Sequence, residues 1–129
     1  MNDQEFLYAF EHGHVHPFPH RDHIRMAWLY LRARDENIAL HKIRHGIQHL
    51  AAALGTSTKY HETITLFWAK AVQVAMTPDV SDFAQFEAQR PELFDSRYIN
   101  QFYSKELLWS EKARREWVEP DLQPLSVME

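Results

Sequence analysis

The stretch HRDHIRMAWLYLRA, residues 20–33, shows the most regular helical pattern in the chain. Its apolar residues occupy positions i, i+3, i+4 and i+7 of one helix face, and they are Ile24, Ala27, Trp28 and Leu31. Pro19 precedes the stretch, and proline suits the start of a helix because the N–H it lacks has no partner there. We therefore predict a helix over residues 20–33.

The same spacing continues on both sides of this helix. It predicts helices over residues 4–11 and 36–54, with Asp35 as the N-cap and Gly55 after the end of the second one. A further helix is expected from Ser57 or Thr58 to Met76, because Pro78 stops it. Shorter helical segments are expected from Ser81 or Asp82 to residue 88 and at residues 96–102, 104–108 and 110–118. The tail, residues 119–129, is expected to lie extended across the helices, with Leu122 and Leu125 as candidates for insertion. The sequence thus predicts an all-α fold, a compact bundle of four or more helices with an extended C-terminal tail, and its 129 residues suit a single domain over residues 1–129.

Composition excludes several classes of site and partner. Cysteine is absent, which rules out thiolate metal sites and cysteine nucleophiles, and the three glycines do not cluster into a nucleotide-binding motif. The formal net charge of −4 does not suit a nucleic-acid-binding protein. The longest apolar stretch, residues 64–76, is too short to span a membrane. We expect a cytoplasmic protein that contacts neither nucleic acid nor membrane.

All nine histidines lie between His12 and His61, and helix periodicity divides them into groups. One group, His41, His45 and His49, lies opposite the apolar stripe of its helix, so we expect it to face solvent. Pairs of histidines at i and i+4 can bind a metal, but exposure favours a merely solvated face. A second group, His12, His14 and His16, lies in a loop where His14 and His16 could hold one ion, although a solvated loop is the simpler interpretation.

The remaining three histidines, His20, His23 and His61, are expected to face the interior at two helix starts. Neutral imidazoles bind divalent transition metals such as zinc, iron, copper or nickel, and three of them with one open position are typical of a catalytic site. The alternative is that each imidazole forms hydrogen bonds with a backbone carbonyl or a carboxylate in the core.

The sequence predicts a substrate pocket beside His61, formed by aromatic and polar side chains. Its expected lining is Trp28, Tyr60, Thr65, Phe67 and Trp68. Aromatic residues at helical spacing are, however, more typical of a packed core. Glu62 follows His61 and is a candidate general base. The zincin motif is not complete, because Thr65 stands where its second histidine would be.

The motifs Pro19–Trp28, Lys59–Thr65 and Val118–Leu125, with Tyr103-Ser104, Ser110 and Ala113-Arg114, resemble a small bacterial family for which no activity is established. The family pattern reads HRDHIR-x-AW, then KYHETIT, then PDLxPL. The resemblance covers most of the chain from Pro19 onward. It includes His20, His23 and His61 and leaves out the other six histidines, but it implies no reaction.

Two functions from different classes follow. The first is a metal-binding helical protein, either a metal sensor or an enzyme that uses a site at His20, His23 and His61 to act on a small organic molecule. The second is a metal-free module with structural histidines that binds a small molecule or a protein. The second function is compatible with a homodimer, because four tryptophans in a small bundle can leave an apolar strip exposed.

Overall fold

The computed structural model describes residues 1–125, and in this part of the chain all regular secondary structure is helical. The α-helices are α1 (Asp3–Glu11), α2 (His20–Ala33), α3 (Glu36–Ala53), α4 (Glu62–Ala75), α5 (Phe83–Gln89), α6 (Lys105–Leu108) and α7 (Glu111–Arg115). Short 3₁₀ helices are η1 (Ser57–Lys59), η2 (Pro91–Phe94) and η3 (Ser96–Gln101). The all-α prediction is confirmed.

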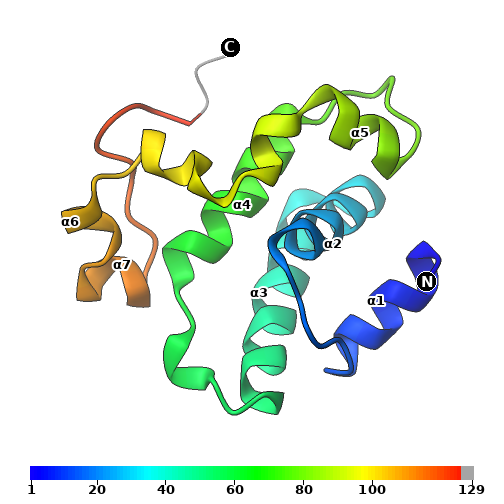
Figure 1. Cartoon of the computed structure of the whole chain (residues 1–129), viewed down its shortest axis with the longest axis horizontal. Helices are drawn as coiled ribbons and strands as arrows, with labels where there is room; N and C mark the ends of the chain where they lie inside the picture. Colours follow the sequence, from blue (N-terminus) through cyan, green and yellow to red (C-terminus); the bar gives the residue numbers. More distant parts are fainter. Residues whose placement is uncertain (126–129) are drawn as a thin grey trace.

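Helices α2, α3 and α4 pack against one another at the centre of the molecule (Figure 1). The predicted bounds of α2 match the structure, and Ile24, Ala27 and Trp28 of its predicted apolar stripe are buried. The core between these helices is strongly aromatic, and among its fully buried side chains are Trp28, Tyr30, Phe67 and Tyr103. Aromatic side chains bury the largest areas, so they supply much of the hydrophobic stabilisation of this small chain.

Helix α1 lies against α3 at a close approach that requires glycine. A Cβ atom at Gly46 would lie 2.3 Å from Cε2 of Phe10, which is fully buried. The absence of a side chain at Gly46 therefore lets the Phe10 ring fill the space between α1 and α3.

The helix after Gly55 starts later than the sequence predicted. Ser57 and Thr58 form η1 instead of capping a long helix, and the backbone of Tyr60 is extended. The N-cap of α4 is His61, whose side chain accepts a hydrogen bond from the Ile64 N–H. The expected start at Ser57 or Thr58 is wrong, because an imidazole nitrogen takes the role that a hydroxyl oxygen was expected to play.

The last third of the chain consists of short helices that begin at polar caps. The side chains of Asp82, Ser104 and Ser110 accept N–H bonds at the starts of α5, α6 and α7. The segment predicted at 96–102 is a 3₁₀ helix capped by Asp95, and the segment predicted at 110–118 already ends at Arg115. Helices α6 and α7 lie together beside α4, on the left of Figure 1.

The chain after α7 crosses back over these helices without regular structure. The Leu122 N–H donates to the Phe102 carbonyl. Leu125 packs against the core, whereas the Leu122 side chain is 56% exposed, so only one of the two leucines inserts. The end of the predicted tail, residues 126–129, lies outside the described residues. Within residues 1–125 no helix combines the length and the apolar character that a membrane span needs.

Candidate ligand pocket

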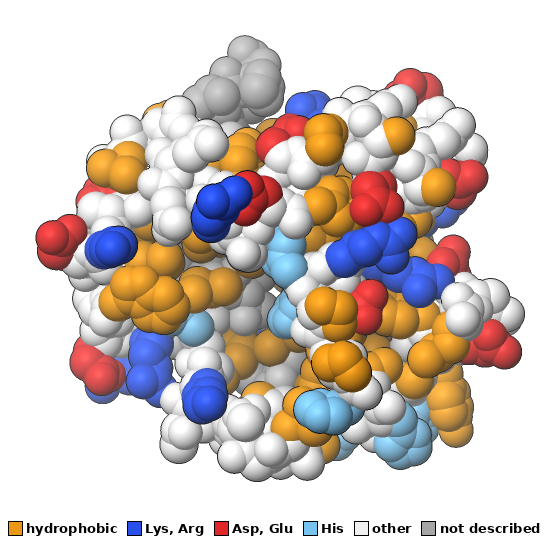
Figure 2. Space-filling model, viewed as in Figure 1, with side chains coloured by type: hydrophobic (Ala, Val, Ile, Leu, Met, Phe, Trp, Pro, Cys, Tyr) orange, Lys and Arg blue, Asp and Glu red, His pale blue; other side chains and the backbone are white. Residues whose placement is uncertain are grey.

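A pocket of about 270 Å³ lies where α2, α3, the start of α4 and the end of α6 meet. Its lining residues are His23, Ile47, Ala51, Thr56, Lys59, Tyr60, His61, Ile64, Thr65 and Trp109. Figure 2 shows the face of the molecule on which these elements meet, hollowed near its middle and bordered there by histidine and hydrophobic side chains. Most of the wall is apolar, and a few polar groups interrupt it, which is the usual composition of a small-molecule site.

His61 has a structural role in this wall. Its Nδ1 accepts the Ile64 N–H at 3.1 Å, so its Nε2 carries the proton and donates to the Leu108 carbonyl at 2.7 Å. Burial lowers its pKa, and the bond to Leu108 partly offsets that effect. Both ring nitrogens are engaged, and together they join the start of α4 to the end of α6.

His20 lies outside the pocket and has a similar role. Its Nε2 lies 2.8 Å from the Leu93 carbonyl, to which it donates, and its ring meets the edge of Trp68 with centroids 4.3 Å apart. Burial lowers the pKa of His20. The ring therefore joins α2 to η2 as a neutral hydrogen-bond donor.

His23 is the exception among the three. It lines the pocket, its ring packs against Phe18 with centroids 4.5 Å apart, and it makes no hydrogen bond with any described residue. Burial, followed by the neighbouring His20, lowers its pKa to about 4. At neutral pH His23 is thus an uncharged imidazole with one N–H and one lone pair available to a ligand.

The structure brings His23 and His61 to one pocket, with His20 on the adjacent turn of α2. Among residues 1–125 no set of three or more His, Asp or Glu side chains is arranged to hold a metal ion. A three-histidine metal site remains a hypothesis, and it requires His61 to release the Ile64 N–H or the Leu108 carbonyl.

Tyr60, Glu62 and Arg44 form a polar group beside the pocket. The Tyr60 hydroxyl donates to Glu62 Oε1 at 2.6 Å, and Arg44 Nε donates to Glu62 Oε2 at 2.8 Å. Burial and the Glu62 carboxylate raise the pKa of Tyr60. Both oxygens of Glu62 are therefore engaged, Oε1 by Tyr60 and Oε2 by Arg44. Tyr60 and Thr65 line the pocket.

Three residues predicted to line this pocket lie in the core instead. Trp28 packs against Phe83 and Phe86, Phe67 contacts Phe102 and Tyr103, and Trp68 contacts His20 and Phe67. Their place in the expected pocket is corrected, because the apolar faces of α2 and α4 pack against each other and leave no space between them. Several further residues line the pocket without a counterpart in the predicted lining, namely Ile47, Ala51, Thr56, Lys59, Ile64 and Trp109. No local pattern singles out Trp109, because only the fold brings α6 beside η1 and α4.

The other six histidines lie outside this pocket. His41, His45 and His49 are exposed on α3 as predicted, and His12, His14 and His16 are exposed in and beside the loop after α1.

Comparison with known proteins identifies no relative, since no family model, curated protein or solved structure matches the chain. The resemblance to a small bacterial family therefore remains a hypothesis.

Proposed function

We propose that this chain binds a small organic molecule in the pocket between α2, α3, α4 and α6, and that His23 recognises a polar atom of that molecule. The observation that carries the proposal is His23 itself, a neutral imidazole that faces the pocket with no hydrogen-bond partner among the described residues. No buried side-chain nitrogen or oxygen among the described residues lacks a hydrogen-bond partner, so the unbonded ring nitrogens of His23 are open to the pocket. A ligand that engages His23 therefore gains a bond without breaking one inside the protein.

The size and lining of the pocket define the class of ligand. Ligand pockets commonly measure about 300–1,000 Å³, so a pocket of about 270 Å³ suits a single ring or a short chain. Ile47, Ile64 and Trp109 contribute apolar surface for the body of such a molecule. Lys59 at the wall forms no ion pair with a described residue, so its positive charge favours a ligand that carries a carboxylate.

Titration of the isotopically labelled protein with benzoate, benzyl alcohol and benzylamine tests this proposal by NMR. We expect benzoate to bind most tightly and to shift the amide signals of residues 56–65 and of Trp109. The His23→Phe variant keeps the apolar volume but removes the polar atoms, and it should weaken benzoate binding about 10-fold or more, the effect of losing one good hydrogen bond.

His45→Ala is the matched control, because His45 is an exposed histidine of α3 outside this pocket. Its affinity for benzoate should equal that of the parent protein. Equal binding by the His23→Phe variant, or shifts confined to another surface, would contradict the proposal.

A metal-dependent function of the same pocket is the second candidate, because His23 and His61 line it together. Elemental analysis of the untagged protein and its His23→Ala variant distinguishes the two functions. Stoichiometric zinc, iron, copper or nickel in the parent protein, lost in His23→Ala, would favour the metal function. His61→Ala is the less direct variant, because it also removes the cap of α4.

A further inference from the structure

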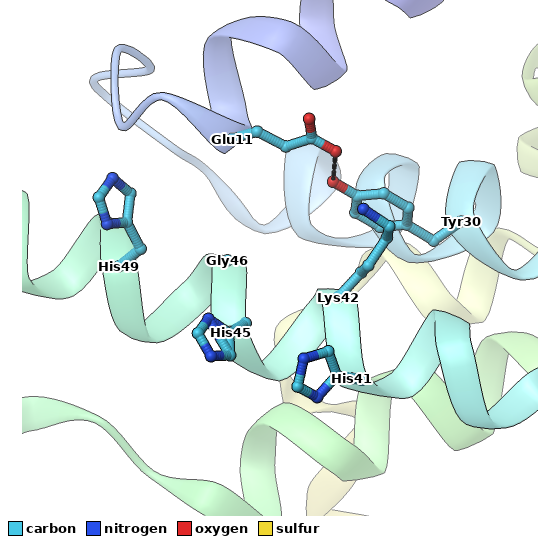
Figure 3. Close-up of a pocket in the computed structure, with 7 residues that line it drawn as sticks. All are labelled: Glu11, Tyr30, His41, Lys42, His45, Gly46 and His49. Carbon is cyan, nitrogen blue, oxygen red and sulfur yellow. Dashed lines mark hydrogen bonds between the residues drawn. The ribbon is translucent and has the colours of Figure 1, made fainter.

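Helix α3 carries three exposed histidines on one face, separate from the pocket described above. His41, His45 and His49 follow one another at intervals of four residues, so they lie on successive turns of the helix. They line a depression of about 380 Å³ that Glu11, Tyr30 and Lys42 also border (Figure 3). None of the three rings makes a hydrogen bond with a described residue.

Two of these rings lie at a distance suited to a shared metal ion. The centroids of His41 and His45 are 4.9 Å apart. Both side chains are exposed, and if each ring turns one nitrogen toward a common metal ion at about 2.1 Å, the metal lies about 3.2 Å from each centroid. In that arrangement the two rings subtend an angle of about 100° at the metal. That angle falls between the square and the tetrahedral values. Figure 3 shows His41 and His45 side by side and His49 farther along α3.

The surroundings leave this pair free to act as ligands. The nearby carboxylate, Glu11, accepts the Tyr30 hydroxyl at 2.5 Å, and Figure 3 shows it directed toward Tyr30. The rings of His12 and His14 are 5.9 Å apart, and His12 Nδ1 already bonds to the Tyr8 carbonyl, so this second pair is less suited to chelation.

We propose that His41 and His45 form a two-histidine chelate for a divalent transition metal, namely copper, nickel or zinc, with water in the remaining coordination positions. Imidazole nitrogen is a preferred ligand for these metals. His41 and His45 lie one turn apart and away from both ends of α3, so the helix backbone already places them for chelation. The proposal does not depend on the function proposed for the His23 pocket.

Isothermal titration calorimetry of the metal-free protein with Ni²⁺ at pH 7.5 tests the site. We expect one Ni²⁺ per chain, and an affinity that falls about 10-fold or more in both His41→Ala and His45→Ala. The matched control is His49→Ala, which removes an exposed histidine of the same helix face and should bind like the parent protein. All three positions are exposed, so the variants should fold.

The Cu²⁺ complex provides a second measurement. Its electron paramagnetic resonance spectrum should show coupling to two imidazole nitrogens, reduced to one in His45→Ala. Equal loss of Ni²⁺ affinity in all three variants, or no loss in His45→Ala, would overturn the proposal, because either result places the metal elsewhere or spreads it over the histidine face.

Discussion

His61 shows how one side chain takes a role that its residue type does not suggest. Its two ring nitrogens cap α4 and bind the Leu108 carbonyl. His61→Ala should lower the free energy of unfolding by about 2–4 kcal/mol, because a lost cap costs about 1 kcal/mol and an unsatisfied buried carbonyl about 1–3 kcal/mol. His61→Asn should recover about 1 kcal/mol, since asparagine caps well but is too short to reach Leu108. Urea unfolding of the three proteins measures this, and equal stability of the Ala and Asn variants would contradict the capping role.

A single residue, His23, also makes the free energy of unfolding depend on pH. Its pKa is about 4 in the folded chain and about 6.5 when unfolded, so between these values the unfolded chain binds the extra proton. The contribution of His23 to the free energy of unfolding is therefore fully present above about pH 6.5, and it is lost as the pH falls toward 4. We expect a loss of about 2 kcal/mol between pH 7 and pH 5 from His23 alone. His23→Gln should show a correspondingly smaller loss in unfolding experiments at the two pH values, and an unchanged pH dependence would contradict the burial of a neutral His23.

The bounds of a helix were predicted well where local sequence signals set them, and poorly where contacts between distant parts of the chain set them. The bounds of α2 follow from Pro19 and the apolar period, and α3 begins at the predicted Asp35 cap. The start of α4 could not be read from the sequence, because the His61 cap is held by Leu108, 47 residues away. The pocket was predicted in part for the same reason: Tyr60 and Thr65 are near His61 in sequence, whereas Trp109 arrives through the fold.

The contact between α1 and α3 carries a prediction at the scale of elements. Gly46→Ala should destabilise the protein by about 1–3 kcal/mol, because the new Cβ would overlap the buried Phe10 ring. Alanine is the better helix former by about 1 kcal/mol, so the clash must outweigh that gain. Phe10→Leu removes the two ring atoms that clash, and combined with Gly46→Ala it should cost less than the sum of the two single changes in thermal unfolding. If the losses of stability in the two single variants simply add in the double variant, the Phe10 ring is not the reason that position 46 requires glycine.

On the scale of the whole molecule, the segment after α7 joins the last quarter of the chain to α4. Thr63, fully buried, donates to the Glu116 carbonyl at 2.8 Å and accepts the Val118 N–H at 3.3 Å. The Tyr103 hydroxyl adds a bond to the Val118 carbonyl at 2.6 Å. Because Trp109, which follows α6 directly, lines the ligand pocket, these bonds also help to hold one wall of that pocket in place.

Thr63→Val should therefore destabilise residues 105–118 more than α2 and α3. The change keeps the side-chain shape but leaves the Glu116 carbonyl and the Val118 N–H without their partner, at a cost of about 1–3 kcal/mol. Amide hydrogen exchange should accelerate about 10-fold or more over residues 105–118, while α2 and α3 keep their protection. Thr65→Val is the matched control, because Thr65 lies half-buried on the same helix and makes none of these bonds. Uniform acceleration through α2 and α3 would instead mean that the chain unfolds as one unit and that Thr63 does not act locally.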